Sequence, residues 1–393
     1  MSRTRDSAKT LERVGRYQLE KRLAMGGMGE VFEATLTSSG GFEKRVALKL
    51  LLPHLARDEH FVAMFLNEAR IAAKLSHPNI CNVYEVGEAD GSYYIAMELL
   101  QGQTVAQLLQ RARGPLPLEL VVAIVRQASA GLQSAHELRD SAGNSLHVIH
   151  RDVTPSNIFV TSSGRVKILD FGVAKARDAM YKTQVGTLKG KFGYMSPEQL
   201  RALELDRRSD VFCLGICTHE MLTGRRLFNR SSIVEATMAI LEDEIPTLAD
   251  AGQPEAVSAV VDKALKRDRE SRYSTVRAFA EALERAAKVN VMSRKQVTAY
   301  VDDMPPASRK KTDALEDDTV NTDGDQPVMT VIDKAPTPLP VMAAIPRSSP
   351  SERISDVVPA EDMKISSDSL MPTIIGAVLF FGAVALVAYL LAS

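Results

Sequence analysis

The sequence contains no tryptophan and only three cysteines among its 393 residues. Three cysteines cannot form the disulfide framework of a small secreted domain, so Cys81, Cys213 and Cys217 are interpreted as buried thiols in a reducing compartment. An excess of either charge is also lacking, because 48 basic residues nearly balance 49 acidic ones. We therefore expect no nucleic-acid partner, since no net field attracts one.

The N-terminal residues 1–16 are polar and lack the apolar stretch of a secretory signal. The other end differs, because residues 374–392 form a run of 19 residues without a charge. As a helix this run extends for roughly 28 Å, close to the thickness of a bilayer core. We predict a transmembrane helix over 371–392 and a single-pass cell-membrane protein whose folded part is cytoplasmic. A buried globular helix is the alternative.

Residues 288–370 contain nine of the 18 prolines and a single aromatic residue, Tyr300. Such a segment cannot bury enough apolar surface to offset the entropy of ordering it. We therefore predict a disordered, Pro-rich juxtamembrane linker. The folded domain is expected over 17–287, preceded by an N-terminal extension over 1–16.

Two kinds of hydrophobic periodicity divide the expected domain. Short β-rich runs and one amphipathic helix fill the part up to residue 98, and helical periodicity dominates from residue 104 onward. The predicted fold class is α+β, with a small β-rich lobe followed by a larger helical lobe. The expected strands are 16–23, 30–35, 45–51, 82–87 and 93–98. The expected helices are 59–75, 105–113, 118–138, 206–223, 233–242, 255–265 and 275–287.

The first chemical motif is a glycine-rich turn between two of the expected strands. Gly26, Gly27 and Gly29 have no side chains, so their backbone amides can approach phosphate groups. A tight β-hairpin would use the same glycines, so the turn alone does not distinguish the two interpretations.

Four further motifs follow the glycine-rich turn in a fixed order. They are Val46-Ala47-Leu48-Lys49, His150-Arg151-Asp152 with Asn157, Asp170-Phe171-Gly172, and Ser196-Pro197-Glu198. Together this set resembles protein kinases, and the Gly-Gly-Met-Gly form is similar to the bacterial eukaryotic-like Ser/Thr branch. The resemblance covers about 17–287. It implies a two-lobed enzyme that transfers the γ-phosphate of ATP to serine and threonine hydroxyls of protein substrates, including its own.

The resemblance assigns a role to each charged residue, since phosphoryl transfer depends mainly on positioning and charge. Lys49, held by Glu68, is expected to bind the α- and β-phosphates. Asn157 and Asp170 offer the hard oxygen ligands that Mg²⁺ prefers, with Mn²⁺ as an alternative metal. Asp152 is expected to orient a substrate hydroxyl and accept its proton.

Further positions are implied by the same resemblance. Met97 is expected to be the gatekeeper, and the backbone at Glu98 and Leu100 is expected to hold adenine. The expected apolar walls, each equally compatible with plain core, are Leu23, Val31, Ala47 and Phe159. Asp210 is expected to brace the catalytic loop, and Arg272 to pair with Glu198.

Three positions depart from the family pattern. Ala24 replaces the first glycine of the turn. Thr154 stands where a lysine is expected, and Lys191 stands where a threonine is expected. The exchange predicts that the Lys191 ammonium group contacts the γ-phosphate in place of the lysine that is missing at position 154. The alternative is that Lys191 is a surface charge and Thr154 fills space.

Two questions stay open at this point. Ala24 and Thr154 support a membrane-anchored pseudokinase scaffold as the alternative function, and a homodimer is neither required nor excluded.

Arg151 is suited to a phosphate on the loop between Asp170 and Glu198. There Thr183 and Thr187 are the best-placed hydroxyls, and we expect one of them to be an activating autophosphorylation site.

Overall fold

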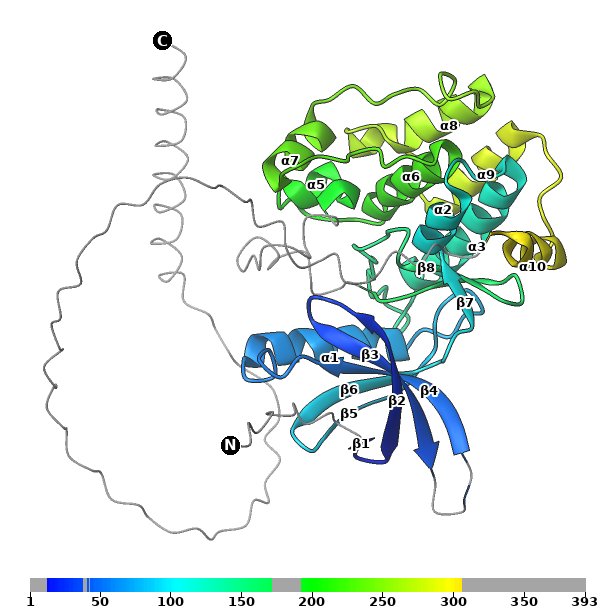
Figure 1. Cartoon of the computed structure of the whole chain (residues 1–393). Coiled ribbons are helices and arrows are strands. Elements are labelled where there is room, and N and C mark those ends of the chain that lie inside the picture. Colours follow the sequence, from blue (N-terminus) through cyan, green and yellow to red (C-terminus); the bar gives the residue numbers. More distant parts are fainter. Residues whose placement is uncertain (1–12, 38–40, 42, 172–191, 306–393) are drawn as a thin grey trace, which may run out of the picture. The chain divides into compact units, whose positions relative to one another are not determined.

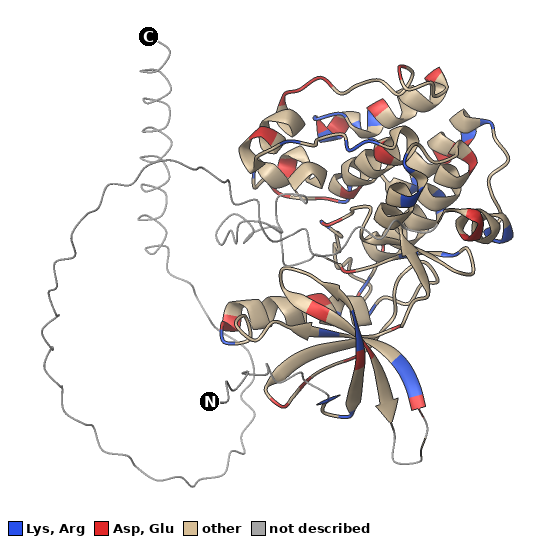
Figure 2. Cartoon of the chain, in the orientation of Figure 1, with Lys and Arg blue, Asp and Glu red and all other residues tan. Residues whose placement is uncertain are grey.

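The computed structural model of the chain describes residues 13–37, 41, 43–171 and 192–305. These residues form two lobes, a β-rich lobe from the first part of the chain and a helical lobe from the second (Figure 1). Basic and acidic residues are interspersed over both lobes (Figure 2). The predicted two-lobed α+β architecture is confirmed.

A six-stranded antiparallel sheet, in the order β1-β2-β3-β4-β6-β5, forms the β-rich lobe. Its strands are β1 (Arg13–Val14), β2 (Tyr17–Met25), β3 (Gly29–Thr37), β4 (Glu43–Leu51), β5 (Val83–Ala89) and β6 (Ser92–Met97). The five strands expected from alternating hydrophobicity are present. The two-residue β1 is too short for a period-2 pattern to reveal it.

Helix α1 (Glu59–Ala73) packs its apolar face against this sheet. Asp58 caps it by accepting a hydrogen bond from the backbone N–H of His60 at 3.0 Å. Phe65 and Ala69 are buried in a cluster with Leu51 of β4. This packing fixes the rotation of the helix and brings the buried Glu68 to the sheet.

A second, three-stranded sheet, in the order β7-β8-β9, was not predicted. It contains β7 (Gly102–Thr104), β8 (Ile158–Thr161) and β9 (Val166–Ile168). Strands of three or four residues give too few alternations to be recognised beside helical segments. Strand β9 leads directly to Leu169 and Asp170.

The helical lobe is built around α3 (Leu118–His136) and α6 (Arg208–Thr223), which are buried along most of their lengths. The remaining helices of this lobe up to residue 287 are α2 (Val105–Ala112), α5 (Pro197–Leu200), α7 (Ile233–Leu241), α8 (Glu255–Ala264) and α9 (Val276–Ala287). The six helices predicted for this lobe are confirmed to within two residues at each end. The four-residue α5 was not predicted.

The prediction that disorder begins at residue 288 is wrong for residues 288–305. Helix α10 (Arg294–Asp303) begins at a capping box formed by Ser293 and Gln296. Val297 and Val301, one helical turn apart, and then Met304 are buried in the core of the helical lobe. Composition averaged over the long segment did not reveal this helix, because its few apolar residues occupy one face of a short, otherwise polar helix.

Helix α10 is fastened to the β8–β9 turn and to α2. A Cβ on Gly164 of the turn would lie 2.0 Å from the carbonyl oxygen of Arg294, so only glycine permits this approach. Thr298 Oγ1 donates to the carbonyl of Ser162 at 3.1 Å. The Arg111 guanidinium donates to the carbonyls of Met304 and Pro305 at 2.6 and 2.7 Å.

Within the described ranges, no helix combines the length and apolarity needed to cross a membrane. The predicted transmembrane helix over 371–392 lies outside the described residues, as do 306–370 of the predicted linker and residues 1–12 of the N-terminal extension.

Candidate active site

Lys49, Glu68 and Asp170 come together from β4, α1 and the end of β9. Lys49 Nζ lies 3.0 Å from Glu68 Oε1 and 3.0 Å from Asp170 Oδ1. Burial by itself lowers the pKa of Lys49, but the carboxylates of Asp170 and Glu68 outweigh burial and raise that pKa above its usual value. Lys49 therefore stays charged although it is only 7% exposed.

The catalytic loop holds Asp152 and Asn157 against each other. Asn157 Nδ2 donates to the backbone carbonyl of Asp152 at 2.8 Å and to its Oδ2 at 3.1 Å. Because Asp152 occupies the amide nitrogen, the amide oxygen of Asn157 is the atom left for a metal. The backbone N–H of Leu169 donates to the Asn157 carbonyl at 2.9 Å, which ties this loop to neighbouring Asp170. An amide oxygen and a carboxylate fit the hard-donor preference of Mg²⁺.

Asp210 braces the catalytic loop from α6, as predicted. Its fully buried carboxylate accepts the backbone N–H groups of His150 and Arg151 at 2.9 and 3.0 Å, and lies 2.7 Å from His136 Nε2. Burial raises the pKa of Asp210, but the bonds from His136 and His150 outweigh it and lower that pKa below its ordinary value. Arg151 has φ +67°, a conformation that the hydrogen bonds to Asp210 hold in place.

His150 connects the two functional carboxylates. Its Nε2 lies 2.9 Å from the carbonyl of Leu169, and its Nδ1 accepts the backbone N–H of Asp152 at 3.2 Å. Its ring lies 4.7 Å from the buried ring of Phe171. The loop carrying Asp152 and the segment carrying Asp170 are therefore positioned by one side chain.

Sequence reasoning missed two supporting residues. His136 ends α3 and contacts Asp210, and Gln199 of α5 donates its Nε2 to the carbonyl of Arg151 at 2.8 Å. Neither residue belongs to a motif used in the prediction. The only signal for His136 was a polar residue at a core-facing position of a helix.

The glycine-rich turn forms the tight hairpin that the sequence left open as one of two interpretations, and its approach to phosphate groups stays a prediction. Gly26 N–H donates to the Gly29 carbonyl at 2.8 Å and closes a hairpin between β2 and β3. A Cβ on Gly29 would lie 2.4 Å from the carbonyl oxygen of Leu50, so the neighbouring strand requires glycine there. A Cβ on Gly27 would meet no atom within 4 Å, so this glycine faces open space.

The residues expected around adenine lie on both sheets. Ala47 on β4 pairs in register with Met97 on β6, and Phe159 lies on β8. The Glu98 backbone N–H donates to the Asn82 carbonyl at 2.9 Å. The Leu100 backbone has no hydrogen bond within the described part of the chain. Adenine contacts at these positions, and at Leu23, Ala24 and Val31, stay predictions.

Thr154 is 5% exposed, and its Oγ1 has no hydrogen-bond partner among the described residues. Its carbonyl accepts the backbone N–H of Asn157 at 2.9 Å, which places it inside the catalytic loop. Lys191, Thr183 and Thr187 lie outside the described residues, so the exchange of lysine and threonine stays a prediction.

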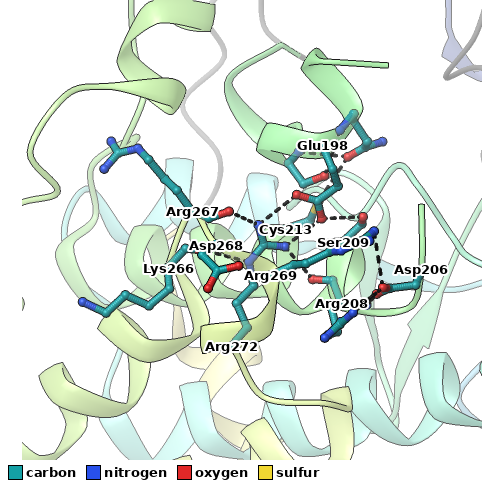
Figure 3. Close-up of polar contacts among 12 residues, drawn as sticks. Glu198, Asp206, Arg208, Ser209, Cys213, Lys266, Arg267, Asp268, Arg269 and Arg272 are labelled. Carbon is teal, nitrogen blue, oxygen red and sulfur yellow. Dashed lines mark hydrogen bonds and ion pairs between the residues drawn. The ribbon is translucent and has the colours of Figure 1, made fainter. Parts of the chain in front are cut away.

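The predicted pair of Glu198 and Arg272 is confirmed (Figure 3). Arg272 Nη1 and Nη2 donate to the two carboxylate oxygens of Glu198 at 2.7 and 2.8 Å, and Ser209 Oγ donates to Oε1 at 2.6 Å. The remaining guanidinium donors bind the carbonyls of Lys266, Arg208 and Arg267. Burial opposes ionisation, yet the bonds from Arg272 lower the pKa of Glu198.

All three cysteines are buried free thiols, as predicted. Burial raises the pKa of Cys81 to about 12 and raises the pKa values of Cys213 and Cys217 well above the ordinary value. Across the described ranges no group of three or more His, Cys, Asp or Glu side chains is placed to hold a metal ion. The cysteine pair on α6 is therefore part of the core.

A buried lysine paired with two carboxylates, beside an aspartate held by an asparagine, defines the site of a nucleotide-dependent phosphotransferase with two lobes. The protein kinase domain family matches residues 17–284, and the chain belongs to this family. Protein kinases use ATP and Mg²⁺ as cofactors, and the donors described above fit both.

Three curated relatives show the range of similarity. Tyrosine-protein kinase MasK of Myxococcus xanthus is 45% identical over 279 residues, which cover 70% of this chain and 43% of MasK. Probable serine/threonine-protein kinase PknB of Lactococcus lactis is 35% identical over 66% of this chain and 40% of PknB. Serine/threonine-protein kinase PrkC of Bacillus subtilis is 32% identical over 74% of this chain and 43% of PrkC. This chain thus spans under half the length of these relatives.

Among solved structures, the PknI kinase domain of Mycobacterium tuberculosis is similar to this chain with a TM-score of 0.55 and 29% sequence identity. The match covers 70% of this chain and 97% of that domain. The shared part is therefore the kinase domain.

Proposed function

We propose that this protein kinase transfers the γ-phosphate of ATP to serine and threonine hydroxyls of proteins, its own chain included. The observation that carries the proposal is the complete set of five residues, four charged and one amide: Lys49 bound to Glu68 and Asp170, and Asp152 held by Asn157. A pseudokinase scaffold would not need to keep all five. The Ser/Thr kinase names of PknB and PrkC support the choice of acceptor.

In this function Asp152 orients the acceptor hydroxyl and takes its proton as the new P–O bond forms. Lys49 binds the phosphates, and Glu68 keeps its ammonium group in place. Asn157 and Asp170 would hold Mg²⁺, which neutralises charge on the phosphate oxygens when bound. Asp210 and His150 keep the two carboxylates in register, so that positioning supplies most of the rate enhancement.

The proposal extends to the departures from the family pattern. We assign Lys191 to the γ-phosphate and Thr154 to its support. The buried Thr154 hydroxyl without a partner in the described structure is consistent with a site that is completed by another group. Loss of activity on removing the Lys191 charge is the test, and it is designed in the Discussion.

Tyrosine phosphorylation is a second candidate, because the 45% identical MasK is named a tyrosine-protein kinase. The Thr154 position also lacks the lysine typical of Ser/Thr kinases. The decisive experiment is incubation of the full chain with Mg²⁺ and labelled ATP, followed by phosphoamino-acid analysis. Phosphoserine or phosphothreonine, absent in Asp152→Asn, supports the first function. Phosphotyrosine alone supports the second, and no label in the wild type contradicts both.

We further propose that the enzyme is anchored to the cell membrane through residues 371–392, with its kinase domain on the cytoplasmic side. The uncharged run over 374–392 supports this, and Arg353 and Lys364 precede it on the side expected to face the cytoplasm. Autophosphorylation at Thr183 or Thr187 is the proposed activating event. Mass spectrometry of the active enzyme tests it, and finding both threonines unmodified contradicts it.

A further inference from the structure

A cavity of about 440 Å³ lies beside the segment that joins the two lobes. Its walls come from residues 76–78, from Asn82 and Glu98, and from four residues between 161 and 167 in β8, β9 and their connecting turn. Among the residues predicted to contact ATP, only Glu98 lines it, and adenine is expected at the Glu98 backbone rather than its side chain. The lining is mostly polar and includes Arg165 and Lys167, so the cavity differs from an apolar core void.

Two cations line this cavity, Lys167 on β9 and Arg165 immediately before that strand. Arg165 and Lys167 are two residues apart and share a face of the chain, whereas Val166 between them is fully buried in the core. Lys167 is 6% exposed, and its Nζ binds Glu98 Oε2 at 2.8 Å and the Ile80 carbonyl at 3.0 Å. The Arg165 guanidinium has no hydrogen bond or ion pair with any residue that the structure describes. Two cations therefore meet a single carboxylate.

The pKa of His77, which also lines the cavity, is affected by the positive charge of Lys167. Its Nδ1 accepts the backbone N–H of Asn79 at 3.1 Å, and its Nε2 has no partner in the described ranges. Burial, followed by the charge of Lys167, lowers the pKa of His77. An anion in the cavity would reverse the second effect, because it would favour the imidazolium.

We propose that this cavity binds the phosphate group of a small phosphorylated molecule. Arg165 supplies a planar pair of donors for two phosphate oxygens, and Lys167 supplies a buried point charge beside it. His77 and the hydroxyl of Ser76 complete the donor set. The cavity volume exceeds that of one phosphate group, so there is room for the molecule that carries it.

Occupancy of the cavity would act on the segment between the lobes. An anion competes with Glu98 for the Lys167 ammonium group. Glu98 in turn accepts hydrogen bonds from the backbone and side chain of Asn82 at 3.3 and 3.2 Å, so its release disturbs a connected network. We expect the KM for ATP to change on phosphate binding. This last step rests on the proposed adenine contact at Glu98, whereas binding itself does not.

Calorimetric titration of the full chain with inorganic phosphate, and separately with O-phosphoserine, tests the site at constant ionic strength. A non-hydrolysable ATP analogue with Mg²⁺ is present throughout, so that the nucleotide site is filled. Saturable binding is expected in the wild type, weakened about 10- to 100-fold in Arg165→Ala, the scale of one charge-assisted bond. Arg277→Ala, which removes an exposed arginine on α9, is the matched control and should bind like the wild type.

Glu98→Gln provides a second variant with the opposite expected sign, because it removes the competing carboxylate and should tighten binding. Tighter binding of phosphoserine than of phosphate identifies a phosphorylated compound as the ligand, and equal affinity identifies free phosphate. Absence of saturable binding in the wild type overturns the proposal. Equal affinities of Arg165→Ala and Arg277→Ala also overturn it. Catalytic activity is not the readout, so failure here is distinct from failure of the proposed kinase function.

Discussion

The Lys49 ammonium group and the Glu68 carboxylate meet at 3.0 Å, although one lies on β4 and the other on α1. Both side chains are buried, and the bond forms only when the apolar face of α1 packs against the sheet. An ion pair desolvated in this way needs both partners, since removing one leaves an uncompensated buried charge. In the proposed function, the position of α1 therefore sets whether Lys49 is held where it can bind phosphates.

Replacing Lys49 with methionine or Asp170 with asparagine should abolish detectable autophosphorylation. Each change removes a charge that acts on the phosphates, and losing one preorganised charged group costs about 10²–10³-fold in kcat. Glu68→Gln should have a smaller effect, because Glu68 acts through Lys49. Rates of ³²P incorporation into the full chain with Mg²⁺ and ATP provide the measurement.

The matched control for these variants is Glu88→Gln, which changes an exposed acid on β5. It should retain the wild-type rate. Circular dichroism melting curves establish that each variant is folded before its rate is compared. Undiminished activity in either Lys49→Met or Asp170→Asn would contradict the assigned roles.

Sequence reasoning named the residues that come together in the candidate site but not all of those that position them. Lys49, Asp152, Asn157 and Asp170 stand in recognisable local motifs, because phosphoryl transfer restricts residue type and spacing. The contact between His136 and Asp210 joins residues 74 positions apart, so no local pattern reveals it.

The same limit applies to the fold. Long periodic helices such as α3 and α6 were predicted within two residues, since each buries a face over several turns. Helix α10 was missed because the average composition of the surrounding segment outweighed two buried valines. The ion pair of Lys167 and Glu98 was missed for a different reason, since isolated charges on short strands carry no pattern.

A chain that ends at residue 305 should be more stable than one that ends at residue 289. The longer chain retains the buried side chains of Val297, Val301 and Met304. Burial of one such side chain contributes about 1.5–3 kcal/mol, partly offset by the entropy of ordering α10. The midpoint of urea unfolding, followed by circular dichroism because tryptophan is absent, provides the measurement.

Within the chain of 305 residues, Val297→Asp should reproduce the loss, and Lys295→Asp, an exposed charge reversal on the same helix, should not. Identical midpoints for the chains ending at 289 and 305 would show that α10 adds no stability.

The ion pair of Glu198 and Arg272 should make stability depend on pH in the acidic range. The pKa of Glu198 is lowered from 4.5 in the folded state, so its contribution is present above about pH 4.5 and is lost as the pH falls through the folded-state value. Glu198→Gln should cost about 3–5 kcal/mol at pH 7, because Arg272 is left buried and unpaired. The difference from the wild type should shrink below pH 4.5.

Urea unfolding at a series of pH values measures this dependence. Glu270→Gln is a suitable control, because Glu270 pairs with Arg208 at the exposed surface, where solvent screens the pair and its loss should cost much less than loss of the buried pair. A wild-type to Glu198→Gln difference that stays constant from pH 7 to pH 3 would contradict the assignment.

Deletion of residues 371–393 should move the protein from the membrane fraction to the soluble fraction. The uncharged run over 374–392 is the segment proposed to enter the bilayer, and burial of its apolar side chains supplies the driving force. Deletion of 319–341, an equal number of residues within the linker, should leave the protein in the membrane fraction. Retention of the first variant in carbonate-washed membranes would disprove the anchor.

The proposed exchange of lysine and threonine predicts that Lys191→Ala lowers kcat by about 10²–10³-fold, the scale of losing one preorganised charge partner of the γ-phosphate. Thr154→Ala should cost less, because the Thr154 side chain is neutral. Initial rates with saturating ATP and a protein substrate measure both effects. Lys310→Ala, which removes a lysine of the linker, controls for loss of positive charge alone.

The double variant Thr154→Lys with Lys191→Thr restores the usual arrangement of the family. Its activity should exceed the product of the effects of Thr154→Lys alone and Lys191→Thr alone, because residues that act as a unit are not additive. The buried position of Thr154 within the catalytic loop requires that melting curves accompany each rate. Wild-type turnover in Lys191→Ala defeats the proposal. Strictly multiplicative effects across the cycle show that the two positions do not share the phosphate, because independent contributions to the transition state multiply in rate.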